Sequence, residues 1–234
     1  MKISNLKIST RLGMGFTLLL ILMVLMTGVG ILRLQEVGSA SDYVTDVRLP
    51  KERLVQEWLQ GVQMNSVRTF ALAKNDDPDD QKYFQDAMDG SSDKINKLQK
   101  QVEDMIKSPK DKELFDQVVA SRAKYRDVRE EVFKAKANKA DDATINQLAK
   151  AKLIPAMDGY TGSIQAILDN EKGMIDQAGT EIQTAFLSGR TMLIGLLVVA
   201  LLIGVFFAWL LSTSITRPLN RAVSIARTVA SGDL

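Results

Sequence analysis

Two long segments without a charged residue constrain the fold of this chain more than any other feature. The first covers residues 12–32 and the second covers residues 191–216, which are 21 and 26 residues long. Because about 20 consecutive apolar residues cross a bilayer as a helix, both segments are predicted to be transmembrane helices. A cleaved signal peptide is the alternative for the first, although its apolar stretch exceeds the usual length of roughly 7–15 residues.

Basic residues beside the two segments predict how the chain is oriented in the membrane. Residues 1–11 carry three basic residues and no acid, and residues 217–234 carry three basic residues and one acid. Lys and Arg are enriched on the cytoplasmic side of membrane spans, so both tails are predicted to be cytoplasmic. Residues 33–190 are then expected to lie on the outer side of the membrane.

The composition excludes several classes of chemistry. The chain contains no Cys and no His, which removes thiolate catalysis, Cys-based metal sites and the commonest general base. We therefore expect no enzymatic activity, no cofactor and no bound metal. Acidic residues 76–80 have the composition of a helix start, with calcium binding as the alternative. Basic residues are dispersed and no phosphate-binding glycine loop occurs, so no nucleic-acid partner is expected.

Residues 33–190 are predicted to form four helices. Helix-starting groups, namely an acid or Ser before Pro78 and Pro109 and a third break at residues 138–142, divide this segment. The resulting pieces are about 33–75, 78–107, 109–138 and 141–190. Each has apolar positions at alternating spacings of 3 and 4, and none alternates like a strand. These positions include Trp58, Leu72, Ile95, Val102, Val118, Tyr125 and Ile164, and a few polar residues such as Glu171 fall on the same spacing.

Four long helices with short connections predict an up-down-up-down bundle, so the chain is expected to be all-α. Pro50 and Pro155 lie inside two of these helices and should kink or restart them, because proline removes a backbone hydrogen bond. Trp58 is predicted to be a core residue of the bundle. Trp209 is predicted to anchor the second span at the membrane interface.

The C-terminal residues carry a further pattern. Arg217-Pro218-Leu219 begins an amphipathic stretch that closes on Gly232-Asp233-Leu234. This pattern resembles the first helix of a HAMP domain and the entry into its connector. Residues 217–234 are therefore expected to be the start of a truncated HAMP domain in a longer receptor.

The complete layout resembles a methyl-accepting chemotaxis protein, a bacterial chemoreceptor with a four-helix-bundle sensor domain. The opening Leu-Lys-Ile-Ser-Thr-Arg-Leu-Gly at residues 6–13 and Arg-Leu-Pro-Lys at residues 48–51 carry this resemblance. It implies a homodimer in the inner membrane with a periplasmic sensor, acting on a cytoplasmic histidine kinase and coupling protein. The sensor of a histidine kinase or diguanylate cyclase is the alternative, and a scaffold that binds only proteins is a third interpretation.

Five polar residues are predicted to form a ligand-binding site in this sensor. They are Arg68, Ser92, Arg122, Tyr125 and Arg129. Regular antiparallel packing places Arg122 and Arg129 level with about residues 60 and 67, and Ser92 level with about residue 62. Arginine offers paired donors to carboxylates, so the group suits a small dicarboxylate or tricarboxylate.

The spacing of Arg122, Tyr125 and Arg129 also resembles the third helix of receptors for tricarboxylic-acid-cycle acids. An amino acid such as aspartate is the second choice of ligand. Acidic residues within 122–131 provide another interpretation, because they can neutralise the arginines on a solvated helix face. Contact with a partner protein is the last alternative.

Overall fold

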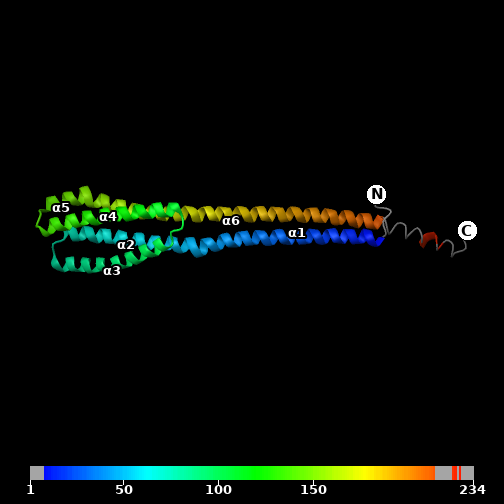
Figure 1. The fold of residues 1–234 in the computed structure, drawn as a ribbon, viewed down its shortest axis with the longest axis horizontal. Coiled ribbons are helices and arrows are strands. Elements are labelled where there is room, and N and C mark those ends of the chain that lie inside the picture. Colours follow the sequence, from blue (N-terminus) through cyan, green and yellow to red (C-terminus); the bar gives the residue numbers. More distant parts are fainter. Residues whose placement is uncertain (1–7, 214–222, 226, 228–234) are drawn as a thin grey trace. The chain divides into compact units, whose positions relative to one another are not determined.

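A computed structural model of the chain describes residues 8–213, 223–225 and 227. Helices and short connections make up these residues, and no strand occurs among them, which confirms the all-α prediction. The α-helices, labelled in Figure 1, are α1 (Ile8–Tyr43), α2 (Leu49–Lys74), α3 (Pro78–Asp104), α4 (Pro109–Ala137), α5 (Asp142–Leu148) and α6 (Ile154–Leu211). Two π-helical turns, η2 (Val44–Arg48) and η3 (Ala149–Leu153), lie directly before α2 and α6. Most of the predicted HAMP segment at 217–234 lies outside the described residues.

The chain divides into two compact units. One contains the described parts of residues 1–40 and 180–234, and the other contains residues 41–179. In the first unit, α1 and α6 each contain a stretch long and apolar enough to cross a membrane. Their apolar side chains are largely exposed, as a lipid-facing surface requires, and Trp209 is 64% exposed. A Cβ added at Gly15 would lie 3.2 Å from the Phe207 ring, so the two helices approach closely there.

Side-chain contacts in the second unit define the bundle topology. α2 runs antiparallel to α3 and parallel to α4, and α4 runs antiparallel to α6, which confirms the up-down-up-down prediction. The pairs that establish these directions are Asn65–Ser92 and Arg68–Ser91, Lys51–Asp111 and Thr69–Tyr125, and Asp111–Asn170 and Ser121–Ser163.

The positions predicted from spacings of 3 and 4 form the core of this bundle. The predicted positions that are buried include Trp58, Leu72, Ile95, Val102, Val118, Tyr125, Ile164 and Glu171. α2 also buries Val55, Leu59 and Val62, which lie beside the predicted stripe. The reason is that α2 contacts three other helices of the bundle, so a wider face of it is covered than a two-helix seam requires.

The predicted helix starts are confirmed by their capping hydrogen bonds. The Asp77 carboxylate accepts from the backbone N–H groups of Asp79 and Asp80, and so caps the start of α3. The Ser108 hydroxyl caps α4 in the same way, and the Asp141 carboxylate caps α5. These side chains satisfy backbone donors that have no partner inside a helix.

The two internal prolines produce π-helical turns. η2 and η3 each end two residues before a proline, and the intervening residue donates its N–H to the carbonyl five residues back. Proline has no N–H and its ring would clash with the carbonyl four residues back, so the wider turn relieves both problems. The predicted interruptions at Pro50 and Pro155 are therefore single widened turns between helices.

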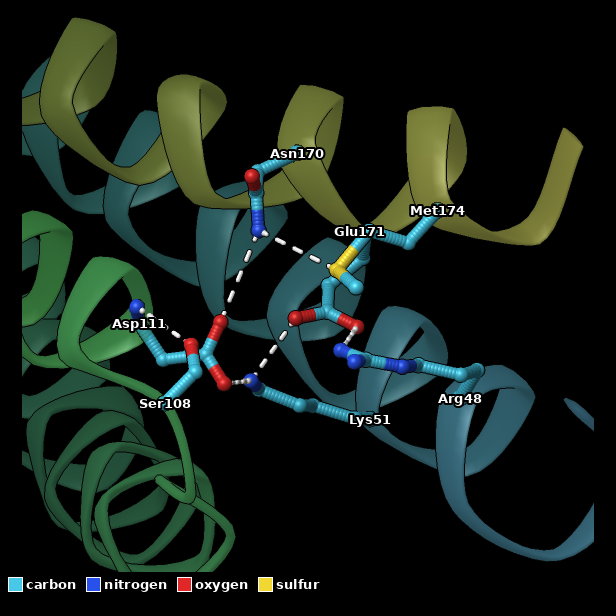
Figure 2. Close-up of polar contacts among 7 residues, drawn as sticks. All are labelled: Arg48, Lys51, Ser108, Asp111, Asn170, Glu171 and Met174. Carbon is cyan, nitrogen blue, oxygen red and sulfur yellow. Dashed lines mark hydrogen bonds and ion pairs between the residues drawn. The ribbon is translucent and has the colours of Figure 1, made fainter. Parts of the chain in front are cut away.

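Four charged side chains are buried together where α2 and α4 begin, and we call them the charge cluster: Arg48, Lys51, Asp111 and Glu171. Figure 2 shows the two cations from η2 and α2 pointing at the Glu171 carboxylate of α6. Arg48 Nη1 lies 3.0 Å from Glu171 Oε2, and Lys51 Nζ lies 2.7 Å from Glu171 Oε1. Lys51 Nζ also lies 3.0 Å from Asp111 Oδ2. Equal numbers of opposite charges make this burial tolerable.

The charge cluster predicts how the free energy of unfolding depends on pH. Burial alone would raise the pKa of Asp111, but the Lys51 ammonium and the Ser108 hydroxyl bring that pKa below its ordinary value of 3.8. A pKa lowered by folding contributes stability above the unfolded-state value and loses it as pH falls through the folded-state value. The stability difference between the native protein and Asp111→Asn should therefore be constant from pH 5 to 7 and shrink below about pH 4.

Urea unfolding of both proteins, followed by circular dichroism across this pH range, measures that difference. Asp116→Asn is a matched control, because Asp116 forms an exposed ion pair with Lys112 on the surface of α4. A difference for Asp111→Asn that stays constant down to pH 2 would contradict the lowered pKa.

Candidate functional site

A pocket of about 410 Å³ opens among the helices of the bundle. Four of the five predicted site residues line it: Ser92, Arg122, Tyr125 and Arg129. The fifth, Arg68, is not among its lining residues. The other lining residues are Val62, Asn65, Gln85, Met88, Asp89, Ile95, Asn96, Arg126, Phe133 and Tyr160. Three arginines and a single acid thus surround the pocket, which makes it electropositive.

Arg122 on α4 is held by two amide side chains of α3. Its Nη2 donates to Asn96 Oδ1 at 2.5 Å, and its Nη1 donates to Gln99 Oε1. Because arginine only donates hydrogen bonds, both amides must present their oxygens to it. The guanidinium is therefore fixed at the pocket wall by neutral groups that leave its charge uncompensated.

Tyr125 and Arg129 form the next part of the wall. The Tyr125 ring is buried, and its hydroxyl lies 2.7 Å from Thr69 Oγ1 on α2. Burial raises the pKa of this phenol, opposed only in part by Thr69 and Arg129, so the hydroxyl stays protonated at neutral pH. The Arg129 guanidinium lies 5.8 Å from the centre of the same ring, a cation–π contact that orients it.

Arg68 acts on the pocket through an amide. Its Nη1 donates to Asn65 Oδ1 at 3.0 Å and to Ser91 Oγ at 2.8 Å. The amide nitrogen of Asn65, which lines the pocket, then donates to Ser92 Oγ at 3.4 Å. Arg68 therefore orients two polar groups of the wall and does not reach the cavity.

Comparison with known proteins places the chain in a family. A family model described as a four-helix-bundle sensory module for signal transduction matches residues 5–186, well over half of the chain. The chain belongs to this family of sensory modules. A search of curated proteins found no match. Modules of this family form the sensor part of chemotaxis receptors, which agrees with the resemblance seen in the sequence.

The helix heights in the sensory module follow the sequence estimate in part. Ser92 contacts Asn65, within one turn of the expected height of residue 62. Tyr125 bonds to Thr69, about one and a half turns beyond the height that regular packing gives it. The shift means that Tyr125 of α4 lies nearer to the C-terminal end of α2 than regular packing predicts.

Two lining residues, Asn96 and Tyr160, and one residue that supports the wall, Gln99, were not predicted. Asn96 and Gln99 continue the spacing of 3 and 4 from Ser92, so the same helical rule identifies them once Ser92 is chosen. Tyr160 comes from α6 and stacks on Tyr125, with ring centres 5.8 Å apart. Its buried hydroxyl completes no hydrogen bond within the described part of the chain, although the Trp58 indole is near. Tyr160 has spacings of 4, 3 and 4 with the buried residues Ile164, Ile167 and Glu171, so the same helical rule could have identified it.

The closest ion pairs of the α4 acids are with lysines and not with the pocket arginines of the sensory module. Glu130 pairs with Lys134, and Glu131 pairs with Lys152. Among the residues that the structure describes, neither Arg122, Arg126 nor Arg129 forms an ion pair. The solvated salt-bridge face considered from the sequence is thus present on α4, but it is built from lysines.

Proposed function

We propose that this sensory module is the sensor of a transmembrane chemoreceptor that binds a small dicarboxylate or tricarboxylate. The observation that carries the proposal is the pocket lined by Arg122, Arg126 and Arg129, none of which forms an ion pair within the described residues, with Asp89 as the single lining acid. Guanidinium groups without a counter-ion favour an anionic ligand, and their paired donors match carboxylate geometry. The protonated Tyr125 hydroxyl adds a donor for a further ligand oxygen.

The hydrogen-bond polarity of the pocket favours an organic acid over an amino acid. Arginine side chains already occupy the amide oxygens of Asn65, Asn96 and Gln99. An ammonium group needs acceptors, and the lining residues supply a single carboxylate, Asp89, against three arginines. This excess of cations favours a ligand whose charged groups are all negative.

The proposed relay runs along α6. This helix contributes Tyr160 to the pocket and contains the second apolar segment. A ligand that binds two positions of α6 with different affinity shifts the balance between them. The movement implied by the family is a slide of about 1–2 Å, passed through a HAMP domain to a module that controls a histidine kinase.

The remaining features of the proposal follow the receptor class. The protein acts as a homodimer in the bacterial inner membrane, with both termini cytoplasmic and the bundle periplasmic. It is a receptor without enzymatic activity of its own, and a coupling protein joins it to the kinase. The two apolar helices support the membrane location, and the family supports the sensory role.

A binding screen tests this function. The full chain in lipid nanodiscs is titrated calorimetrically with succinate, malate and citrate, and with aspartate, glutamate and serine. At least one organic acid should bind, and the amino acids should bind at least tenfold more weakly. A ligand at 100 times its dissociation constant should also stabilise the bundle by about 2.7 kcal/mol. Binding of aspartate in preference to every organic acid would contradict the ligand class, and no binding by any compound would contradict the site.

A further inference from the structure

We propose that the charge cluster is a latch that fixes the axial register of α6 against α2 and α4. All four of its residues are at most 7% exposed, so solvent screens their interactions little. The cluster lies at the opposite end of the bundle from α5, away from the ligand pocket, and none of its members lines that pocket. Its position therefore requires a role other than ligand binding.

Glu171 is the centre of the latch. Its two carboxylate oxygens are each occupied by a different cation, Arg48 and Lys51, which lie one turn apart on η2 and α2. Figure 2 shows that the two cations approach the carboxylate from the neighbouring segment formed by η2 and α2, across the interface with α6. A single side chain of α6 is thus clamped at two points to the neighbouring helix.

The geometry of this clamp is sensitive to sliding along the helix axis. The contacts are 2.7 and 3.0 Å long, whereas one residue of an α-helix advances the chain by about 1.5 Å. A slide of that size stretches and misaligns both contacts, which lie near the short end of the hydrogen-bonding range. Because weakening the contacts of a buried charge is costly, the ion pairs favour this register of α6 over its neighbours.

The two cations have other partners that remain when Glu171 leaves. Lys51 keeps Asp111 on α4, at 3.0 Å. The Arg48 guanidinium lies 5.2 Å from the centre of the Tyr43 ring, a cation–π contact within its own segment. Glu171 has no such substitute among the described residues. The latch can therefore open as a discrete step, and the unpaired Glu171 is what opposes its opening.

Arg48 reaches this position because of the π-helical turn. It is the last residue of η2, so the widened turn before Pro50 sets the direction in which its side chain leaves the helix. The same turn contains an extra residue, so the side chains before it point in directions that differ from a continuation of α2. The widened turn and the buried ion pair of Arg48 thus favour the same register of α2 and α6.

The charge cluster fixes the register of α6 whether or not the protein is a receptor. Only the role of that register in signalling rests on the proposed function. Tyr160 and Glu171 are 11 residues apart on α6, about 16 Å along the axis. A rigid helix carries a displacement at one of them to the other. Loss of ligand binding would disprove the receptor proposal and leave the latch untouched, because the test below uses ligand-free protein.

Spin-label distances measure the register directly. The chain contains no Cys, so two introduced cysteines are its only labelling sites. Val67→Cys on α2 is suitable because Val67 is 65% exposed, and Gly162→Cys on α6 is suitable because an added side chain there meets open space. The full chain in nanodiscs is measured by pulsed electron paramagnetic resonance, without ligand.

With the labelled chain diluted into excess unlabelled chain, so that only distances within one subunit are measured, the latch predicts a single narrow distance distribution for the native protein. Glu171→Gln should shift its mean by up to about 1.5 Å, the rise of one residue, or add a second population. The matched control is Glu57→Gln, which removes an exposed ion pair between α2 and α3 and should leave the distribution unchanged. A helical Glu171→Gln protein with the native distribution would overturn the latch.

A second variant keeps the test decisive where Glu171→Gln loses its helical circular-dichroism signal. Arg48→Lys retains the charge but shortens the side chain and removes the planar guanidinium, so the bundle keeps its electrostatic balance. The latch predicts a broader distribution for this variant than for the native protein. An unchanged distribution in Arg48→Lys would overturn the latch equally.

Discussion

Alanine at Arg122 or at Arg129 is expected to weaken binding of a small dicarboxylate by about 100-fold or more. Truncating one side of a buried charge pair costs about 2–5 kcal/mol, and each 1.4 kcal/mol is a factor of ten in affinity. Arg122 offers a guanidinium held by two neutral amides, and Arg129 offers one held over the Tyr125 ring. Calorimetric titration of each variant with the best ligand from the screen measures the loss.

The fold of these variants must be intact for the result to count. Both arginines are only partly buried, so their helical circular-dichroism signals should equal that of the native protein. Arg53→Ala on the exposed face of α2 is the matched control and should bind with native affinity. Native affinity in both Arg122→Ala and Arg129→Ala would rule out this pocket as the carboxylate site.

Replacing Trp58 with alanine is expected to lower the free energy of unfolding by about 3–5 kcal/mol. Trp58 is fully buried, and its ring lies 6.2 Å from that of Phe115, so its removal leaves a cavity in the centre of the bundle. Trp58→Phe should cost less, because most of the volume is retained and the buried indole nitrogen, which has no hydrogen-bond partner in the described chain, is removed.

Denaturant unfolding monitored by circular dichroism checks this prediction. Trp209→Ala is the matched control, since Trp209 is the second tryptophan of the chain and is largely exposed on α6. Its replacement should leave the stability of the bundle unchanged. A Trp58→Ala protein as stable as Trp209→Ala would show that Trp58 does not fill the core.

Features with a local cause were predictable from the sequence. A helix start needs only a capping side chain within three residues, so Asp77, Ser108 and Asp141 marked their helices correctly. The side chains of Arg122, Tyr125 and Arg129 lie on one side of α4 because positions three and four apart share a helix face. Four of the five candidate site residues consequently line one pocket.

Features that depend on the register between helices were not predictable. Lys51 was not recognised as a buried residue, although it bridges Asp111 and Glu171. Arg68 was expected in the site and instead orients Asn65 at its wall. Tyr160 on α6 stacks on Tyr125 of α4, a pairing that no spacing within α6 specifies. Each case requires a relation between distant segments that no repeat within one helix specifies.

The sequence by itself therefore determined the two segments that are long and apolar enough to span a membrane, the helical pieces, their caps and the family of the sensory module. Its charge-free stretches and its spacing of 3 and 4 reflect properties of a single helix, which neighbouring residues alone can establish. The tertiary structure decided which polar side chains meet: the arginine pocket at one level, and the charge cluster at another. Hydrogen bonds and ion pairs change within about one residue's rise, so only the packed registers of α2, α4 and α6 could assign them.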